Sequence, residues 1–82
     1  MSVETGSSTK TVEIFVPLRN EGTDVMRPTR GLIVGPDEVQ VLPTPDYDPS
    51  LEEWEFPPGT RVKCSKELRG NRELLVARER MD

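Results

Sequence analysis

The chain has 82 residues, of which 33% are hydrophobic and 32% are charged, and its formal net charge is −4. A chain of this length forms one domain with a small core. The negative charge disfavours nonspecific binding to nucleic acid or to anionic membranes. The sequence contains no histidine, which excludes Ser-His-Asp and Cys-His catalytic sites and histidine-dependent metal sites within the chain.

Cysteine usage and hydropathy bear on the cellular compartment. Cys64 is the only cysteine, so an internal disulfide is impossible, whereas small secreted domains usually rely on several. No window approaches the roughly 20 apolar residues of a membrane span, and residues 1–8 lack the basic and apolar regions of a signal peptide. The sequence therefore predicts a cytoplasmic protein without a membrane segment.

The chain divides into a polar start and a single small β domain. Residues 1–10 are rich in Ser, Thr and Gly, which predicts a disordered leader, and residues 11–80 are expected to form the domain. From Thr11 onward apolar side chains recur at every second position, which predicts a half-buried strand. The positions on its apolar face are Val12, Ile14, Val16 and Leu18. Pro17 has no amide hydrogen, so the strand ends there or lies on an edge.

A second strand and a hairpin are expected next. The strand begins near Thr23, and Pro28 predicts a bulge or an edge position before the strand resumes through residues 29–34. The run Gly35-Pro36-Asp37 is a strong turn signal. Residues 39–42 therefore form the returning strand of a hairpin.

A long acidic connection follows this hairpin. Residues 46–59 carry a charge of −5 with no Lys or Arg, and several prolines interrupt any regular element. Within this segment Asp48 can cap one short helical turn near residues 48–53, with Pro49 at its first position. The glutamates of that turn favour the positive end of its dipole.

Two more strands are expected after the connection. Val62 and Cys64 alternate with polar residues, and Gly70-Asn71 marks a turn before residues 73–80. The continuous apolar run of the last strand leaves two alternatives for the pair that faces the core, Leu74 with Val76 or Leu75 with Ala77. Five short strands and no helical period predict an all-β fold, either a small five-stranded antiparallel SH3-like barrel or a strongly bent sheet. The barrel is favoured because closure removes exposed edges.

Two sequence blocks suggest a family. They are Glu21-Gly22-Thr23-Asp24-Val25-Met26-Arg27-Pro28 and Trp54-Glu55-Phe56-Pro57-Pro58-Gly59. Their pairing resembles a family of small bacterial proteins that carry such blocks at about this separation and have no established activity. The resemblance covers residues 11–79, and the family has an aromatic residue, usually Trp, where this chain has Met26. It implies a bacterial origin and a fold; the Pro-Gly-Thr-Arg-Val run is also similar to the strand entry of SH3-like barrels in translation and transcription factors.

The aromatic pair Trp54 and Phe56 has two interpretations. Because the two residues alternate, they share a face in an extended segment. They either plug the open end of the barrel, burying up to about 200 Å² each, or Trp54 lines a shallow groove for a peptide or a base together with Tyr47. Cys64 alternates with Val62 and is interpreted as a small buried hydrophobe rather than a nucleophile.

The acidic connection has three interpretations: a solvated loop, a docking surface for a basic partner, or a metal site. Asp46, Asp48 and Ser50 follow the spacing of the first calcium ligands, but Leu51 stands where the calcium loop needs Gly and Pro57 where it needs Glu. We therefore predict no metal and no cofactor. The candidate residues for binding a protein partner are Asp46, Tyr47, Asp48, Glu52, Glu53 and Trp54.

The C-terminal segment is basic, with a local charge of +3 over residues 60–82. Five of its residues are candidates for contacts with nucleic-acid phosphates. They are Arg61, Lys63, Lys66, Arg69 and Arg72. No aromatic residue follows Phe56, whereas surfaces that bind single strands usually carry several. A simpler expectation is that the acidic connection folds over this hairpin and screens it.

These observations lead to two hypotheses on function. The first is a non-enzymatic protein-binding or accessory module that uses the acidic connection and the Trp54 surface. The alternative is a nucleic-acid or ribosome-associated barrel that uses the basic C-terminal hairpin. An enzyme is the third choice, because the sequence offers no catalytic constellation.

Overall fold

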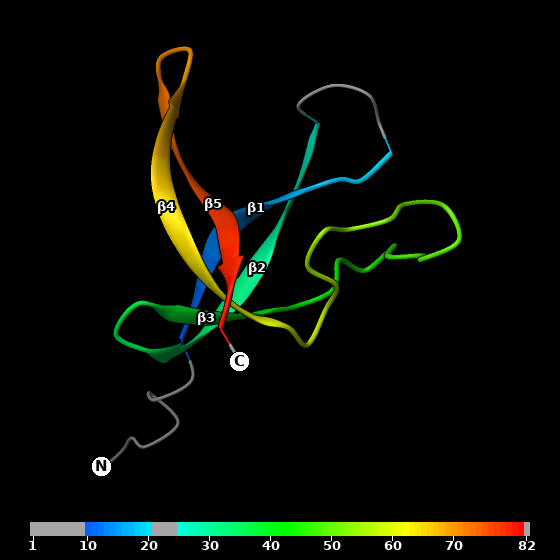
Figure 1. Ribbon diagram of the computed structural model, residues 1–82, viewed down its shortest axis with the longest axis horizontal. Coiled ribbons are helices and arrows are strands. Elements are labelled where there is room, and N and C mark those ends of the chain that lie inside the picture. Colours follow the sequence, from blue (N-terminus) through cyan, green and yellow to red (C-terminus); the bar gives the residue numbers. More distant parts are fainter. Residues whose placement is uncertain (1–9, 21–24, 82) are drawn as a thin grey trace.

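The computed structural model describes residues 10–20 and 25–81, which form five β-strands and no helix (Figure 1). The strands are β1 (Thr11–Pro17), β2 (Met26–Gly35), β3 (Glu38–Val41), β4 (Arg61–Arg69) and β5 (Arg72–Arg80). They follow one another around a closed barrel in chain order. The predicted all-β class and the closed five-stranded barrel are confirmed, and the architecture is consistent with a small SH3-like barrel.

The barrel closes through a parallel pair of strands. Consecutive strands pair antiparallel, so in a ring of five the first and last strands point in the same direction. β1 and β5 accordingly pair in parallel, through the register pair Phe15 and Val76. This one junction is parallel in the otherwise antiparallel barrel, because an odd number of alternating strands cannot close in any other way.

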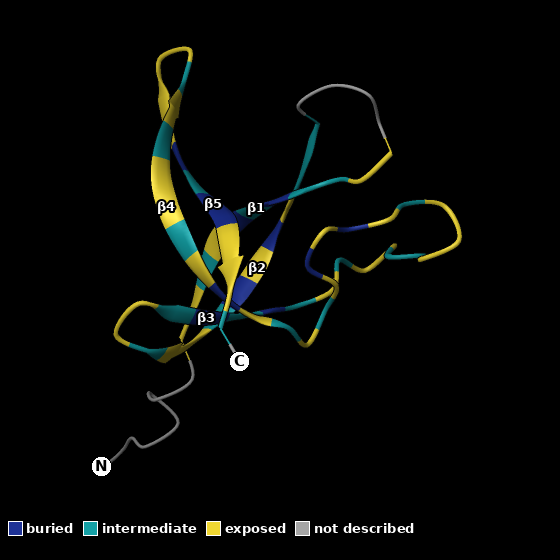
Figure 2. Cartoon of the chain, in the orientation of Figure 1, coloured by how far each residue is buried: buried dark blue, intermediate teal, exposed yellow. Residues whose placement is uncertain are grey.

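Each strand contains buried residues, and so does the connection between β3 and β4 (Figure 2). The alternation predicted for β1 is confirmed, since Ile14 and Val16 are fully buried while Val12 and Leu18 pack against the same cluster from its rim. The core cluster consists of Ile14, Val16, Val39, Val41, Trp54, Phe56, Val62 and Ala77. Two of these residues, Trp54 and Phe56, come from the connection between β3 and β4, so a loop completes the core.

β5 is covered on both of its faces, which explains its continuous apolar run. Ala77 belongs to the core cluster and Leu75 packs against it. Val76 is fully buried on the opposite face, where its register partners are Phe15 of β1 and Ser65 of β4. Both predicted pairs are therefore largely buried, and the pair that contains Ala77 faces the barrel core.

β2 runs through Pro28 without interruption. Its register with β1 is continuous there, so the predicted bulge at this residue is wrong. The alternative prediction of an edge position holds, because β3 pairs with β2 only from Gly31 onward and a missing amide hydrogen at Pro28 costs nothing on the open side. The register shift lies instead between Ile33 and Gly35, next to the predicted hairpin turn at Pro36-Asp37, which is confirmed.

The acidic connection spans residues 42–60 and contains the predicted single turn. Asp48 Oδ1 accepts a hydrogen bond from Ser50 N at 2.9 Å, and Glu52 N donates to Asp48 O at 3.1 Å. These bonds are those of an N-terminal cap followed by one turn. The turn does not continue into a helix.

Backbone hydrogen bonds fasten the connection to the end of β1. Arg19 N donates to Glu53 O at 2.7 Å, and Glu55 N donates to Pro17 O at 2.9 Å. Between these two bonds Trp54 forms an isolated antiparallel bridge with Leu18. The connection is therefore attached to the barrel on both sides of its tryptophan.

Some expectations fall outside the described residues. They are the leader at residues 1–9, the first four residues of the family block, 21–24, and the start of the second strand at Thr23. The described residues contain no helix long and apolar enough to cross a membrane.

A substitution at Gly31 tests how tightly β2 packs on the core. A Cβ atom at this position would lie 3.1 Å from Ile14 Cδ1 and 3.2 Å from Val39 Cβ. We expect the substitution Gly31→Ala to lower the free energy of unfolding by about 1–3 kcal/mol, as measured by urea denaturation. Gly35→Ala is the matched control, because its Cβ would meet Glu38 only at 3.4 Å. Equal losses in the two variants would contradict the tight packing at Gly31.

Candidate functional site

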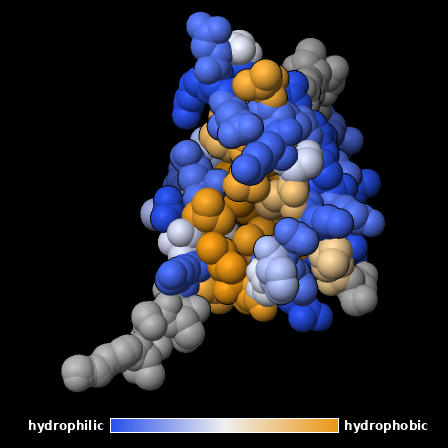
Figure 3. All heavy atoms as spheres, turned by 90° about the vertical axis from the view of Figure 1, so that its left-hand side faces the viewer, coloured by the Kyte–Doolittle hydropathy of each residue, from blue (hydrophilic) through white to orange (hydrophobic). Residues whose placement is uncertain are grey.

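An apolar groove lies between the β2–β3 hairpin and β4. It has a volume of about 270 Å³. Its walls are formed by Val12, Ile33, Gly35, Pro36, Asp37, Glu38, Val39, Cys64, Lys66 and Leu75. Hydrophobic atoms gather over this side of the molecule, which faces the viewer in Figure 3. We call this cavity the β3–β4 groove.

The β3–β4 groove exists because two neighbouring strands part. In the described chain β3 and β4 pair only at Val39 with Val62 and at Gln40 with Arg61. Beyond this point β4 continues alongside β5 as a long hairpin, while β3 turns back into β2. The floor of the opening is apolar because Val12 and Leu75 pack against the barrel core from this side.

Exposed apolar side chains border the groove. Ile33, which lines it, is 41% exposed, and the neighbouring Val34 is 43% exposed. Burying such side chains against a partner is worth up to about 1.5–3 kcal/mol each. Leu68, which is 75% exposed, lies further along β4 on the same face as Lys66. Contiguous exposed apolar surface is common at sites that contact other molecules, so the groove is a candidate for such a site.

Charged groups lie at the two walls of the groove. Lys66 stands on the β4 wall, and Asp37 and Glu38 stand on the hairpin wall. Glu38 is paired with Arg61 at 3.3 Å. Within residues 10–20 and 25–81, Lys66 and Asp37 take part in none of the ion pairs, so both remain available to a ligand.

Cys64 is the one thiol of the groove. It is free, half-buried and packed against the core cluster. Burial raises the pKa of its thiol, which disfavours the nucleophilic thiolate. The interpretation of Cys64 as a small hydrophobe fits this environment.

The acidic connection lies on the other side of the barrel from the tip of the β4–β5 hairpin (Figure 1). Its glutamates pair with arginines just after the end of β1 and at the start of β2. Glu52 accepts hydrogen bonds from Arg27 through both carboxylate oxygens, and the carboxylate of Glu53 lies 3.9 Å from Arg19 Nε. The expectation that this connection folds over the basic hairpin is therefore wrong. The reason is that the core takes up Trp54, and this anchors the neighbouring glutamates beside β1 and β2.

The candidate partner-binding residues of the connection divide into two groups. Trp54 is only 3% exposed and lies in the core, as in the plug interpretation. Tyr47 packs edge-on against it with ring centroids 4.8 Å apart. The carboxylates lie outside this pair: Asp46 and Glu53 are exposed, whereas Asp48 and Glu52 are half-buried. The exposed groups of this loop that a partner could contact include its carboxylates and the 76% exposed Leu51.

Glu52 connects the surface of the loop to the core. Its Oε1 atom accepts a hydrogen bond from Trp54 Nε1 at 3.1 Å and another from Arg27 Nε at 3.1 Å. These two bonds lower the pKa of the Glu52 carboxyl, with the Arg27 bond the larger cause. Glu52 therefore holds the indole of Trp54 in place, which makes it a structural residue of the loop. A small hollow of about 140 Å³ beside it is lined by Arg27, Asp46, Asp48, Leu51 and Glu52.

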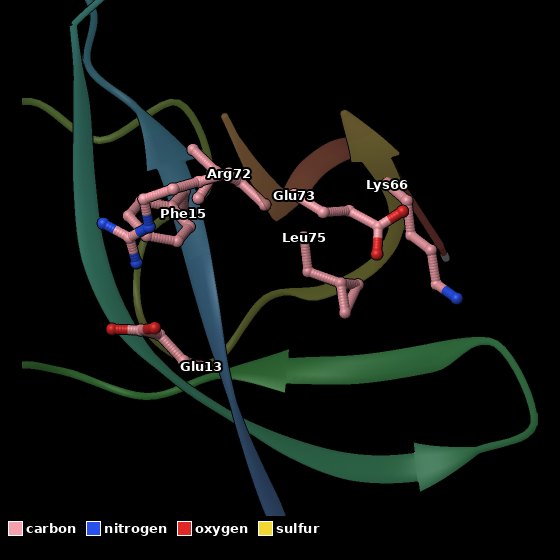
Figure 4. Close-up of a pocket in the computed structure, with 7 residues that line it drawn as sticks. Glu13, Phe15, Lys66, Arg72, Glu73 and Leu75 are labelled. Carbon is pink, nitrogen blue, oxygen red and sulfur yellow. The ribbon is translucent and has the colours of Figure 1, made fainter. Parts of the chain in front are cut away.

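The five basic candidates do not form a continuous strip. Directly opposite residues of an antiparallel pair share a face, so Lys66, opposite Leu75, lies on the groove face. Arg69 and Arg72 lie opposite each other on the other face, together with Lys63. Figure 4 shows a separate hollow, smaller than the β3–β4 groove, beside β5. The side chain of Arg72 points toward Phe15 of β1 on one side of this hollow, and Lys66 lies on its other side. Arg61 is paired with Glu38.

Glu67 binds two arginines of the basic hairpin. Its carboxylate accepts two hydrogen bonds from Arg78, at 2.7 and 2.8 Å, and one each from Arg69 and Ser65 at 2.9 Å. These bonds, led by that from Arg78, lower the pKa of Glu67 to about 2. Within the described hairpin, the charges of Arg69 and Arg78 are therefore partly offset by this one carboxylate.

Comparison of the chain with protein families, with curated proteins and with solved structures finds no match. Among the described residues no group of three or more Cys, Asp or Glu side chains is arranged to hold a metal ion.

Sequence reasoning did not find the groove. One signal was available in Leu32, Ile33 and Val34, three consecutive apolar residues in a strand with one buried face. Alternation in such a strand forces at least one of them outward. The parting of β3 from β4, in contrast, depends on long-range pairing that no local pattern encodes.

The Glu67 cluster predicts a pH dependence of stability. Because the pKa of Glu67 in the folded protein lies below its usual value of 4.5, its contribution to stability is complete above that pH and is lost as the pH falls toward 2. We expect the urea midpoint of the wild type to fall over this range, and less steeply in Glu67→Gln. Glu73→Gln, which removes an exposed carboxylate from the same hairpin, is the control. A Glu67→Gln variant as acid-sensitive as the wild type would contradict this assignment.

Proposed function

We propose that this chain is a non-enzymatic protein-binding domain that serves as an accessory module. The observation that carries the proposal is the β3–β4 groove, an apolar cavity of about 270 Å³ bordered by the exposed side chains of Ile33 and Val34. A domain with so small a core gains stability by burying such side chains. Their exposure in the isolated domain is therefore best explained by a partner that covers them.

The ionisable groups support a role without catalysis. The pKa values of Asp48, Glu52 and Glu67 are all lowered, so these carboxyls are poor general acids near neutral pH. The pKa of Cys64 is raised. With no histidine in the sequence, no described group with a shifted pKa is tuned toward proton transfer at neutral pH.

The acidic connection is a second surface for the same function. Asp46 and Leu51 are exposed around the hollow beside Arg27. A basic partner segment would find carboxylates here, as the sequence suggests, but contact would be limited to the loop exterior. Replacing Glu52 is a poor test of this surface, because the change also frees the indole of Trp54.

The resemblance to a bacterial family completes the proposal. We infer a bacterial, cytoplasmic protein from the Trp54–Gly59 block, from the matching block that ends at Pro28 and from the single free cysteine, Cys64. A five-stranded SH3-like barrel is a scaffold that many binding modules share, so the fold supports the role only as an analogy.

Nucleic-acid binding is the alternative function, and it makes a separate prediction. Lys66 lies on a different face from Arg69 and Arg72, and Glu67 already binds Arg69 and Arg78. We therefore expect a short single-stranded DNA or RNA to leave the amide NMR spectrum of the domain unchanged at low salt, where phosphate contacts are strongest. Shifts confined to β4 and β5 would instead favour the alternative.

Two matched variants test the proposed function. Ile33→Glu places a charge in the groove, and Leu51→Glu makes the same change on the acidic connection, where the side chain is even more exposed. We expect a protein captured from a bacterial lysate by the wild type to be captured equally by Leu51→Glu and to be lost, by at least about tenfold, with Ile33→Glu. Both variants should keep the wild-type thermal stability, since neither side chain is buried.

The opposite pattern of capture would assign partner binding to a different surface. Loss with Leu51→Glu and retention with Ile33→Glu would move the site to the acidic connection. The same captured proteins with both variants, or none that depend on the folded domain, would contradict the proposed function.

A further inference from the structure

The edge of β4 that faces the β3–β4 groove lacks a strand partner along most of its length. In the described residues β4 pairs with β3 only at Arg61 and Val62, and it then runs on to Arg69 with β5 on its other side. The open stretch from Lys63 to Arg69 is about 20 Å long. Its outward amide and carbonyl groups form a template on which an extended segment can pair.

The side chains beside this edge match an added strand. On the groove face of β4 the residues in order are Cys64, Lys66 and Leu68, each opposite a β5 residue of the same face. Cys64 and Lys66 line the groove, and Leu68 is exposed. A strand lying next to β4 would therefore meet an apolar, a cationic and an apolar position in turn.

The charged side chains at the open edge determine which side chains an added strand should carry. Within residues 10–20 and 25–81, Lys63 and Lys66 take part in no ion pair, whereas Glu67 is already bound by Arg69 and Arg78. On the groove face of the open edge the positive charge is that of Lys66, with Glu73 of β5 on the same face, whereas Lys63 lies on the other face opposite Glu79. A carboxylate placed next to Lys66 would complement it, and a basic side chain there would be repelled.

We propose that the open edge of β4 binds an extended segment of a partner protein as an added β-strand, with apolar side chains beside Cys64 and Leu68 and an acidic one between them beside Lys66. This inference rests on the proposed function, because it names how the same groove is occupied. Main-chain hydrogen bonds to β4 supply affinity, and the groove selects the side chains.

Repulsion between like charges disfavours a second copy of this chain as the occupant. Two β4 edges paired about Lys66 would place this lysine opposite itself, and pairing about Ser65 would place Arg61 opposite Arg69. Like charges directly opposite each other are destabilising. Residues 1–9 of the chain offer one carboxylate, Glu4, and their remaining side chains are mostly small and polar, which fits the apolar positions poorly.

The test uses a defined peptide, Thr-Val-Thr-Glu-Thr-Val-Thr with blocked ends. Its Val, Glu and Val side chains fall on one face of a strand, and its sequence reads the same in both directions. We expect amide shifts in the NMR spectrum of the domain from Lys63 to Arg69 and around Ile33. Replacing Glu by Lys in the peptide should weaken binding by about fivefold or more.

Two N-methylated peptides test the main-chain pairing itself. Methylating the amides of Val, Glu and Val blocks one edge of the strand, and methylating those of the Thr residues blocks the other. Strand addition requires that one of these peptides loses binding while the other keeps it. If both bind as well as the parent peptide, the groove holds side chains only and the strand-addition proposal is overturned, although the proposed protein-binding function stands.

A charge variant of the domain tests the role of Lys66. Lys66→Glu should weaken binding of the peptide by about fivefold and bind the version with Lys in place of Glu more tightly than the wild type does. Arg72→Glu is the matched control, because it makes the same charge change on the same hairpin but outside the groove. Equal effects of the two variants would overturn the assignment of the acidic side chain to Lys66.

Other occupants give different outcomes. If the parent peptide fails to bind and sedimentation shows a dimer that Ile33→Glu dissociates, a second copy fills the groove and the proposal is overturned. Binding that appears only after deletion of residues 1–9 would show that this segment occupies the edge, which would overturn it as well. Absence of peptide binding by a monomeric domain of either length would also overturn it.

Discussion

The architecture of this barrel depends on the short parallel junction between β1 and β5. Five strands that alternate in direction bring the first and last together in parallel, and here the two meet at Phe15 and Val76. In the described residues the short junction leaves the outer edge of β5 open beyond Val76, and the parting of β3 from β4 leaves the edge of β4 open beyond Val62. The β3–β4 groove lies beside the open edge of β4, and the smaller hollow lies beside that of β5 (Figure 4).

The connection between β3 and β4 supplies the large aromatic side chains of the core. Trp54 and Phe56 fill the barrel from the connection between β3 and β4, and backbone bonds to Pro17 and Arg19 hold that connection against β1. The opening between β3 and β4 has no such plug among residues 10–20 and 25–81. One side of the molecule is therefore closed by its own chain, and the other is left apolar and accessible (Figure 3).

Local patterns predicted much of the fold and little of the site. Alternation in β1, the turn at Pro36-Asp37 and the Asp48 cap depend on neighbouring residues, and each is present as expected. The parallel junction and the parting of β3 from β4 depend on the strand count and on long-range register. The placement of the acidic connection was missed for a similar reason, because net charge suggested the basic hairpin while burial of Trp54 determined its position.

Glu52 has a consequence for how this protein can change during evolution. One carboxylate serves both a guanidinium at the surface and an indole in the core, so a substitution there to suit a new partner would also disturb the interior. Asp46 and Leu51, a few residues away, are exposed, and neither belongs to the core cluster. A substitution at either position would therefore change the surface without disturbing the interior. The loop thus combines a constrained position with freely variable ones. Divergence among descendants of this chain should concentrate at the variable positions.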